Sequence, residues 1–208
     1  MCFSATASFT AAGVLAATGI VASRHALKHP TFRAYAAIPL FFALQQAIEG
    51  AQWLVDKPSE LSTLLGYGFI FFAFLFWPAF IPYAVYRLET NAKRKRLLRD
   101  VMVVGMMCSL YLLTALFYNP LTVAVLGHSL DYRIFVAYED VGVALYVSVV
   151  CGSAILSTRY RVKICGLLTL VAFLVTTWAF NETFTSVWCF FAAALSLLVI
   201  WEVLKPNK

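Results

Sequence analysis

The segment Phe41–Trp53 places a carboxylate and three glutamines inside an apolar run that is long enough to cross a membrane. Gln45, Glu49 and Gln52 recur at i, i+4 and i+7, so they share one stripe of a helix. An ionisable side chain at membrane depth costs about 2.5–3.5 kcal/mol on insertion scales, and such residues mark functional sites by default. Glu49 is therefore the residue around which we look for a site.

Thiols, an imidazole and a carboxylate are the side chains of this chain that bind transition metals. Two thiolates with an imidazole and a carboxylate form a mixed set that suits zinc, and the soft thiolates also suit copper(I). We expect a zinc or copper site with four ligands: Cys2, Glu49, His128 and Cys189. If Met1 is removed, the free amine and thiol of Cys2 could also act as a nucleophile with its own base, or as a bidentate ligand.

Two adjacent acids, Glu139 and Asp140, lie in the first turns of a later apolar segment. Near a metal, either could orient a ligand or act as general base on a bound water, so both are candidate catalytic residues. The alternative is that they only favour the positive end of their helix. Glu49 also has a structural alternative, in which a protonated carboxyl bonds to Gln45 or Gln52 and joins helices. Cys108, Cys151 and Cys165 are interpreted as small apolar core residues.

The composition identifies an integral membrane protein. Of the 208 residues, 62% are hydrophobic and 12% are charged, whereas soluble domains are about 45–50% apolar and about 25% charged. The net charge of +6 comes from short basic clusters between apolar runs. That pattern reflects membrane topology and does not require a nucleic-acid partner.

Hydropathy predicts an all-α bundle of seven transmembrane helices, each near the ~20 residues that a bilayer requires. The predicted spans are Ala5–Ser23, Ala34–Val55, Ser62–Tyr86, Val101–Phe117, Phe135–Leu156, Val162–Phe180 and Phe184–Val203. Pro78 and Pro82 predict a kink near Trp77 in the third span. No internal repeat is visible, so residues 1–208 are treated as a single domain.

The basic residues predict the orientation. With the N-terminus outside and the C-terminus in the cytoplasm, 14 basic residues lie inside and two, Lys57 and Arg133, lie outside. This orientation places the unusual polar groups in the outer half, together with a longer outer loop, Asn119–Ile134. The cytoplasmic half then shows only basic anchors, His25 and His29.

Four stretches of this chain resemble a family of small bacterial multi-pass membrane proteins of unknown function. They are MCFSATASF at the start, IPLFFALQQAIEGAQW, GHSLDY, and SVWCFFAAALS near the end. The resemblance implies a shared multi-helix fold in the bacterial inner membrane and brings no established activity or cofactor. These four stretches contain Cys2, Glu49, His128 and Cys189.

Three functions fit the sequence. The first is a membrane metalloprotein, with metal-dependent catalysis as one form of it, whose site opens to the outer face and takes a small molecule. The second is a small-solute or proton-coupled transporter that uses Glu49. The lack of polar residues within the membrane in the cytoplasmic half argues against a transporter. The third is a non-catalytic ligand-binding or structural subunit. The lipid bilayer is the one partner that all three require.

Overall fold

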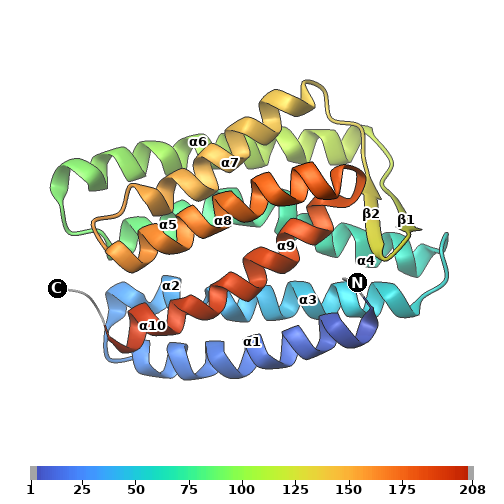
Figure 1. Cartoon of the computed structure of the whole chain (residues 1–208). Helices are drawn as coiled ribbons and strands as arrows, with labels where there is room; N and C mark the ends of the chain where they lie inside the picture. Colours follow the sequence, from blue (N-terminus) through green and yellow to red (C-terminus); the bar gives the residue numbers. More distant parts are fainter. Residues whose placement is uncertain (1–3, 206–208) are drawn as a thin grey trace.

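The computed structural model describes residues 4–205, without the side chain of Asn181. The described residues are mostly helical and form an elongated bundle (Figure 1). The α-helices are α1 (Ala5–Ala26), α2 (Arg33–Ala36), α3 (Ile38–Leu54), α4 (Glu60–Ile70), α5 (Trp77–Leu88), α6 (Ala92–Tyr118), α7 (Glu139–Ile155), α8 (Tyr160–Ala179), α9 (Phe184–Leu195) and α10 (Val199–Leu204). Two strands, β1 (Thr122–Leu126) and β2 (Ser129–Arg133), form an antiparallel hairpin at one end of the bundle, here termed the hairpin end.

Seven helical rods correspond to the seven predicted spans, with α4 and α5 forming one rod and α9 and α10 another. Within residues 4–205, five of these rods are long and apolar enough to cross a membrane: Ala5–Ala26, Glu60–Leu88, Ala92–Tyr118, Tyr160–Ala179 and Phe184–Leu204. The helices α3 and α7 have 17 residues each. These findings confirm a mostly helical protein with several helices that are long and apolar enough to cross a membrane, whereas its topology and orientation stay predictions.

Two boundaries differ from the sequence expectation. The fifth rod begins at Glu139 and not at Phe135, because Tyr138 has a left-handed backbone with φ 51° that interrupts the helix. The loop expected at Asn119–Ile134 contains the β-hairpin, whose turn uses Gly127 at φ 58°. The hairpin is held at the bundle because Leu130 is buried and Tyr132 stacks on Phe69 of α4 at 4.4 Å between ring centroids.

The predicted irregularity near Trp77 is a π-helical segment, Phe71–Phe76, that joins α4 to α5. Pro82 has no N–H, so the carbonyl oxygen of Pro78 lacks its usual helical donor. The helix α6 packs directly on this carbonyl, because Gly105 has no side chain there. Ser109, one turn further along α6, donates a hydrogen bond of 2.7 Å to the carbonyl of Leu75. The surface of α6 therefore fits the irregular rod formed by α4 and α5, because Gly105 leaves room for one backbone carbonyl and Ser109 donates to another.

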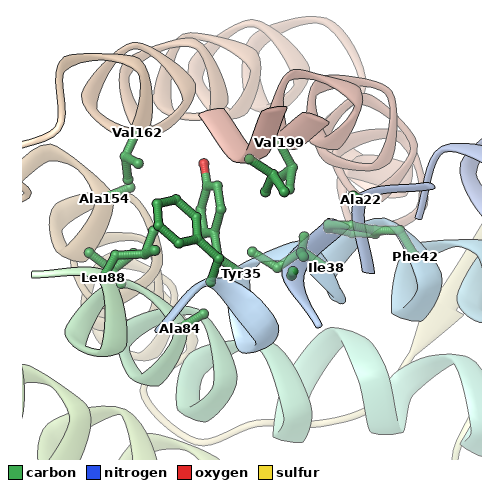
Figure 2. Close-up of a cluster of buried hydrophobic side chains, with 14 of the residues drawn as sticks. Ala22, Tyr35, Ile38, Phe42, Ala84, Leu88, Ala154, Val162 and Val199 are labelled. Atoms are coloured by element: carbon green, nitrogen blue, oxygen red, sulfur yellow. The ribbon is translucent and has the colours of Figure 1, made fainter. Parts of the chain in front are cut away.

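The main apolar core lies toward the end opposite the hairpin. Figure 2 shows the ring of Tyr35 in α2 among apolar side chains that come from six other helices. The labelled neighbours are Ala22, Ile38, Phe42, Ala84, Leu88, Ala154, Val162 and Val199. Because these side chains belong to helices that are distant in the sequence, the core fixes the relative positions of the rods.

A buried carboxylate joins two turns at this opposite end. Glu89, just after α5, accepts hydrogen bonds from the backbone N–H groups of Thr90 and Asn91. It also accepts two from Thr158, one from the backbone N–H at 2.7 Å and one from the hydroxyl at 2.8 Å. Burial by itself raises the pKa of Glu89, but these hydrogen bonds outweigh it, so the pKa lies below the usual value. The charged carboxylate therefore ties the α5–α6 turn to the α7–α8 turn.

The Glu89→Gln variant is expected to lose about 1–3 kcal/mol of stability at pH 7, because an amide cannot accept all four hydrogen bonds. The folded-state pKa is the lower one, so the contribution of Glu89 is complete above about pH 4.3 and is lost as the pH falls through the folded-state value. Thermal unfolding in mild detergent between pH 3 and pH 7 measures both effects. A wild-type midpoint that changes with acid no more than that of the variant would contradict this role.

Candidate functional site

The polar stripe predicted on α3 is buried inside the bundle. Gln45, Gln46, Glu49 and Gln52 are all 0% exposed. The carboxylate of Glu49 accepts a hydrogen bond of 3.1 Å from Nε2 of Gln46, one turn earlier. It accepts a second from the hydroxyl of Ser186 in α9, which is 137 residues away in the sequence. Glu49 therefore joins α3 to α9.

The two outer glutamines of the stripe join α3 to two further helices. Trp77 of α5 donates its indole N–H to Oε1 of Gln45 at 2.7 Å. Gln52 donates its Nε2 to the hydroxyl of Ser62 in α4 at 2.6 Å. The helix α3 also packs along α1, so α3 contacts α1, α4, α5 and α9. The glutamines thus act partly as connections between helices.

Several polar atoms around Glu49 have no hydrogen-bond partner among the described residues. They are Ser8 Oγ, Gln45 Nε2, Gln46 Oε1, Gln52 Oε1, Trp53 Nε1 and Tyr132 OH. Ser8 of α1 lies near this group, because α1 runs antiparallel to α3 and the next residue, Phe9, lies against Gly50 of α3. Each unsatisfied buried group costs about 1–3 kcal/mol, and native proteins normally pair such groups with water or a ligand. The cluster therefore has capacity for bound water or a polar ligand.

A cavity of about 660 Å³ adjoins this cluster at the hairpin end. Tyr132 of β2 and Cys189 of α9 line the cavity, and both lie close enough to Glu49 to interact with it electrostatically. The thiol of Cys189 also lies beside the side chain of Gln45. Tyr132 and Cys189 are 8% and 6% exposed, and they form the wall of the cavity that faces the polar cluster.

The structure brings two of the four expected metal ligands together. Glu49 and Cys189 are neighbours, whereas His128 is exposed at the hairpin turn. Within residues 4–205, no group of three His, Cys, Asp or Glu side chains is placed to hold a metal ion. Cys2 lies outside the described residues. The described part of the chain thus supplies two of the four expected ligands at one place.

Of the two candidate catalytic acids, Glu139 lines the cavity and Asp140 is the next residue along the chain. Glu139 and Asp140 form the first turn of α7 and are both exposed. Glu139 lines the cavity together with Asp131, Arg133 and Glu182. Glu139 is therefore separated from Glu49 by the wall that Tyr132 and Cys189 form, and a catalytic role for either acid stays a prediction.

A second buried carboxylate lies at the opposite end, where the sequence suggested only basic anchors and histidines. Glu202 of α10 is 0% exposed and pairs with Arg159 at 2.7 Å. Arg161 lies 3.9 Å from its other oxygen, and the guanidinium of Arg161 packs over the ring of Trp201. The expectation of no buried acid in this half is wrong. A carboxylate in the apolar run preceding the C-terminal lysines was the signal that could have revealed it.

A smaller cavity of about 70 Å³ lies between the two polar regions. It shares Tyr146, Trp188 and Cys189 with the larger cavity and extends to Tyr35 and Cys165. Tyr35 lies close enough to Glu202 to interact with it electrostatically. Polar or polarisable side chains are therefore present along the bundle from Glu49 to Glu202.

A family model described as a family of unknown function, DUF6629, matches residues 1–208, so the chain belongs to that family. This agrees with the resemblance seen in its sequence motifs. No curated protein and no solved structure matches the chain. The apolar helices indicate a membrane protein, and the family is one of unknown function.

Proposed function

We propose that this DUF6629 protein binds a small molecule from the outer face of the membrane, in the cavity of about 660 Å³ at the hairpin end. The assignment of the hairpin end to the outside rests on the distribution of basic residues. Tyr132 and Cys189 form the inner wall of the site, and the buried cluster around Glu49 lies behind them. The cavity would receive the ligand and the cluster would supply hydrogen-bonding groups.

One observation carries this proposal, namely that the cavity adjoins buried polar atoms without partners. Tyr132 belongs to both, because it lines the cavity and its hydroxyl has no partner among the described residues. Cavities of about 300–1,000 Å³ with mostly apolar walls and a few convergent polar groups are typical ligand sites.

Reaction of single cysteines with a charged methanethiosulfonate reagent tests whether the cavity is open. In a chain that keeps only Cys189, the thiol is expected to react at least tenfold faster than in a chain that keeps only Cys151. Both thiols are buried, but Cys189 lines the large cavity and Cys151 only the small internal one. Protein in nanodiscs exposes both faces, so the result does not depend on orientation.

Two outcomes decide this test. Equal rates for Cys189 and Cys151 would show that the cavity is closed to solutes and would contradict the proposal. In intact cells, a reagent that cannot cross membranes should modify Cys189 from outside, and modification only after permeabilisation would place the hairpin end in the cytoplasm.

As a second candidate we propose a zinc or copper ion held by Glu49, Cys189 and Cys2, with His128 as the fourth expected ligand. The proximity of Glu49 and Cys189 favours this candidate. Elemental analysis of the purified protein should then give about one equivalent of metal that is lost in Cys189→Ser. Metal below about a tenth of an equivalent would exclude it. In this candidate, Glu139 or Asp140 would act on a metal-bound water.

A carrier function is a third proposal, and buried Glu202 favours it because a translocated proton or solute would need polar groups at both ends. It predicts solute or proton flux in proteoliposomes that Glu49→Gln abolishes. Flux that is unchanged in this variant would exclude a carrier that uses Glu49.

A further inference from the structure

We infer that the cavity at the hairpin end takes an amphipathic organic cation, with its charge at the mouth and its apolar part between aromatic walls. This inference rests on the proposed function and names the class of ligand. It follows from the charge of the mouth, the composition of the walls and the position of one unpartnered hydroxyl.

The mouth of the cavity is acidic although the whole chain is basic. Three carboxylates and one guanidinium line the cavity, a net charge of −2, in a chain whose net charge is +6, and two of the carboxylates, Glu139 and Glu182, are exposed at its mouth. Arg133 is engaged by the carboxylate of Asp131 and lies 3.9 Å from that of Glu182. Glu139 makes no ion pair within the described residues. A cation at the mouth would therefore meet uncompensated negative charge.

The walls are rich in aromatic rings, which attract cations through their faces. The aromatic lining residues are Phe74, Tyr132, Phe135, Tyr146, Phe184 and Trp188. Trp188 is fixed in place, because its indole N–H donates to the carbonyl of Thr169 and its ring packs on Tyr146 and Phe173. A rigid aromatic wall loses little freedom when a flat or branched apolar group packs on it.

Tyr132 lines the inner wall of the cavity, and its hydroxyl is a buried polar group beside Glu49 and Cys189. The side chain of Tyr132 is more than nine-tenths buried, lines the cavity, and has no partner for its hydroxyl among the described residues. The unpartnered hydroxyl of Tyr132 is therefore a second observation beside the cavity, independent of the acids. An amphipathic cation suits the acidic lining and the aromatic walls, whereas an anion of the same shape would meet the carboxylates first.

Tetraphenylphosphonium and tetraphenylborate test this inference, because they share nearly the same shape and carry opposite charges. Each ion is titrated separately into full-length protein in zwitterionic nanodiscs, and binding to empty nanodiscs is subtracted. Tetraphenylphosphonium is expected to bind saturably with one site per chain. Its affinity should fall about tenfold in the Glu139→Gln, Glu182→Gln double variant, and should fall with added salt.

Glu60→Gln is the matched control, because Glu60 is exposed at the start of α4, near the same end of the bundle, and does not line the cavity. Its affinity for tetraphenylphosphonium should equal that of the wild type within about twofold. Both glutamine variants replace exposed side chains, so their folding should be unaffected, and thermal unfolding checks this.

Saturable binding of tetraphenylborate, or an unchanged affinity in the double variant, would overturn the inference of a cation. The proposed function would survive either result, since a ligand would still occupy the cavity. If neither ion binds saturably but Cys189 is accessible, only the inference of a cation is lost. If neither binds and Cys189 is also inaccessible, the proposed function fails with it.

Discussion

Replacing Glu49 with alanine is expected to lower the free energy of unfolding by about 2–5 kcal/mol. The change removes the acceptor of two buried donors, Nε2 of Gln46 and the hydroxyl of Ser186. Each buried donor left without a partner costs about 1–3 kcal/mol. Thermal unfolding in mild detergent, with the yield of folded protein as a second readout, measures this loss.

Glu49→Gln provides the sharper comparison, because an amide keeps one acceptor oxygen and nearly the same volume. We expect it to lose about half as much stability as Glu49→Ala. Asp100→Ala is the control for removing a carboxylate from the surface, and its effect should stay within about 0.5 kcal/mol, because Asp100 is exposed. A Glu49→Ala variant as stable as the wild type would contradict the connecting role of Glu49 and would leave only a role in binding or chemistry.

Gly105→Ala is expected to cause the largest loss of stability among single methyl additions, at about 3 kcal/mol or more. A Cβ at this position would lie 1.9 Å from the carbonyl oxygen of Pro78 and 3.0 Å from Val149. The clash is with backbone, which cannot rotate away as a side chain can, so α5 and α6 must separate. The same thermal unfolding assay, or loss of the folded fraction in size-exclusion chromatography, checks this result.

Gly152→Ala is the matched control, because it adds the same methyl group to α7 where no atom outside the helix lies within 4 Å. Alanine there should be neutral or should stabilise by up to about 1 kcal/mol, since glycine is the poorer helix former. Equal effects of the two substitutions would show that α6 does not pack on the Pro78 carbonyl as closely as described.

The Glu49 cluster and the Gly105 contact are linked through the rod that contains Pro78 and Pro82. The indole of Trp77, at the start of α5, reaches Gln45 in the polar stripe. The ring of Trp77 also stacks on Phe42 at 3.9 Å between centroids. A displacement of α5 in Gly105→Ala should therefore loosen the wall of the Glu49 cluster, so the Cys189-only chain with this change should label faster.

The spans of this protein could be predicted because they depend on local sequence. An apolar run of about 20 residues identifies a membrane helix without knowledge of its neighbours. The rod Phe184–Leu204 differs from its predicted bounds by one residue. The start of α7 could not be placed in this way, because Phe135 to Tyr138 are mostly apolar but not helical, and the left-handed Tyr138 directly precedes the helix. The β-hairpin was not predicted from the sequence, because contacts with α4 and α9 determine which of its side chains are buried.

The sequence by itself determined that this chain is a membrane protein of several helices and that Glu49 is an unusual buried acid on a stripe with glutamines. Both facts follow from composition and helical periodicity. Only the tertiary structure decided that Glu49 meets Ser186 and not His128, and that Glu202 is buried against Arg159. Such contacts depend on how each helix is rotated and which helices are neighbours. These are properties of side-chain packing between segments more than 40 residues apart.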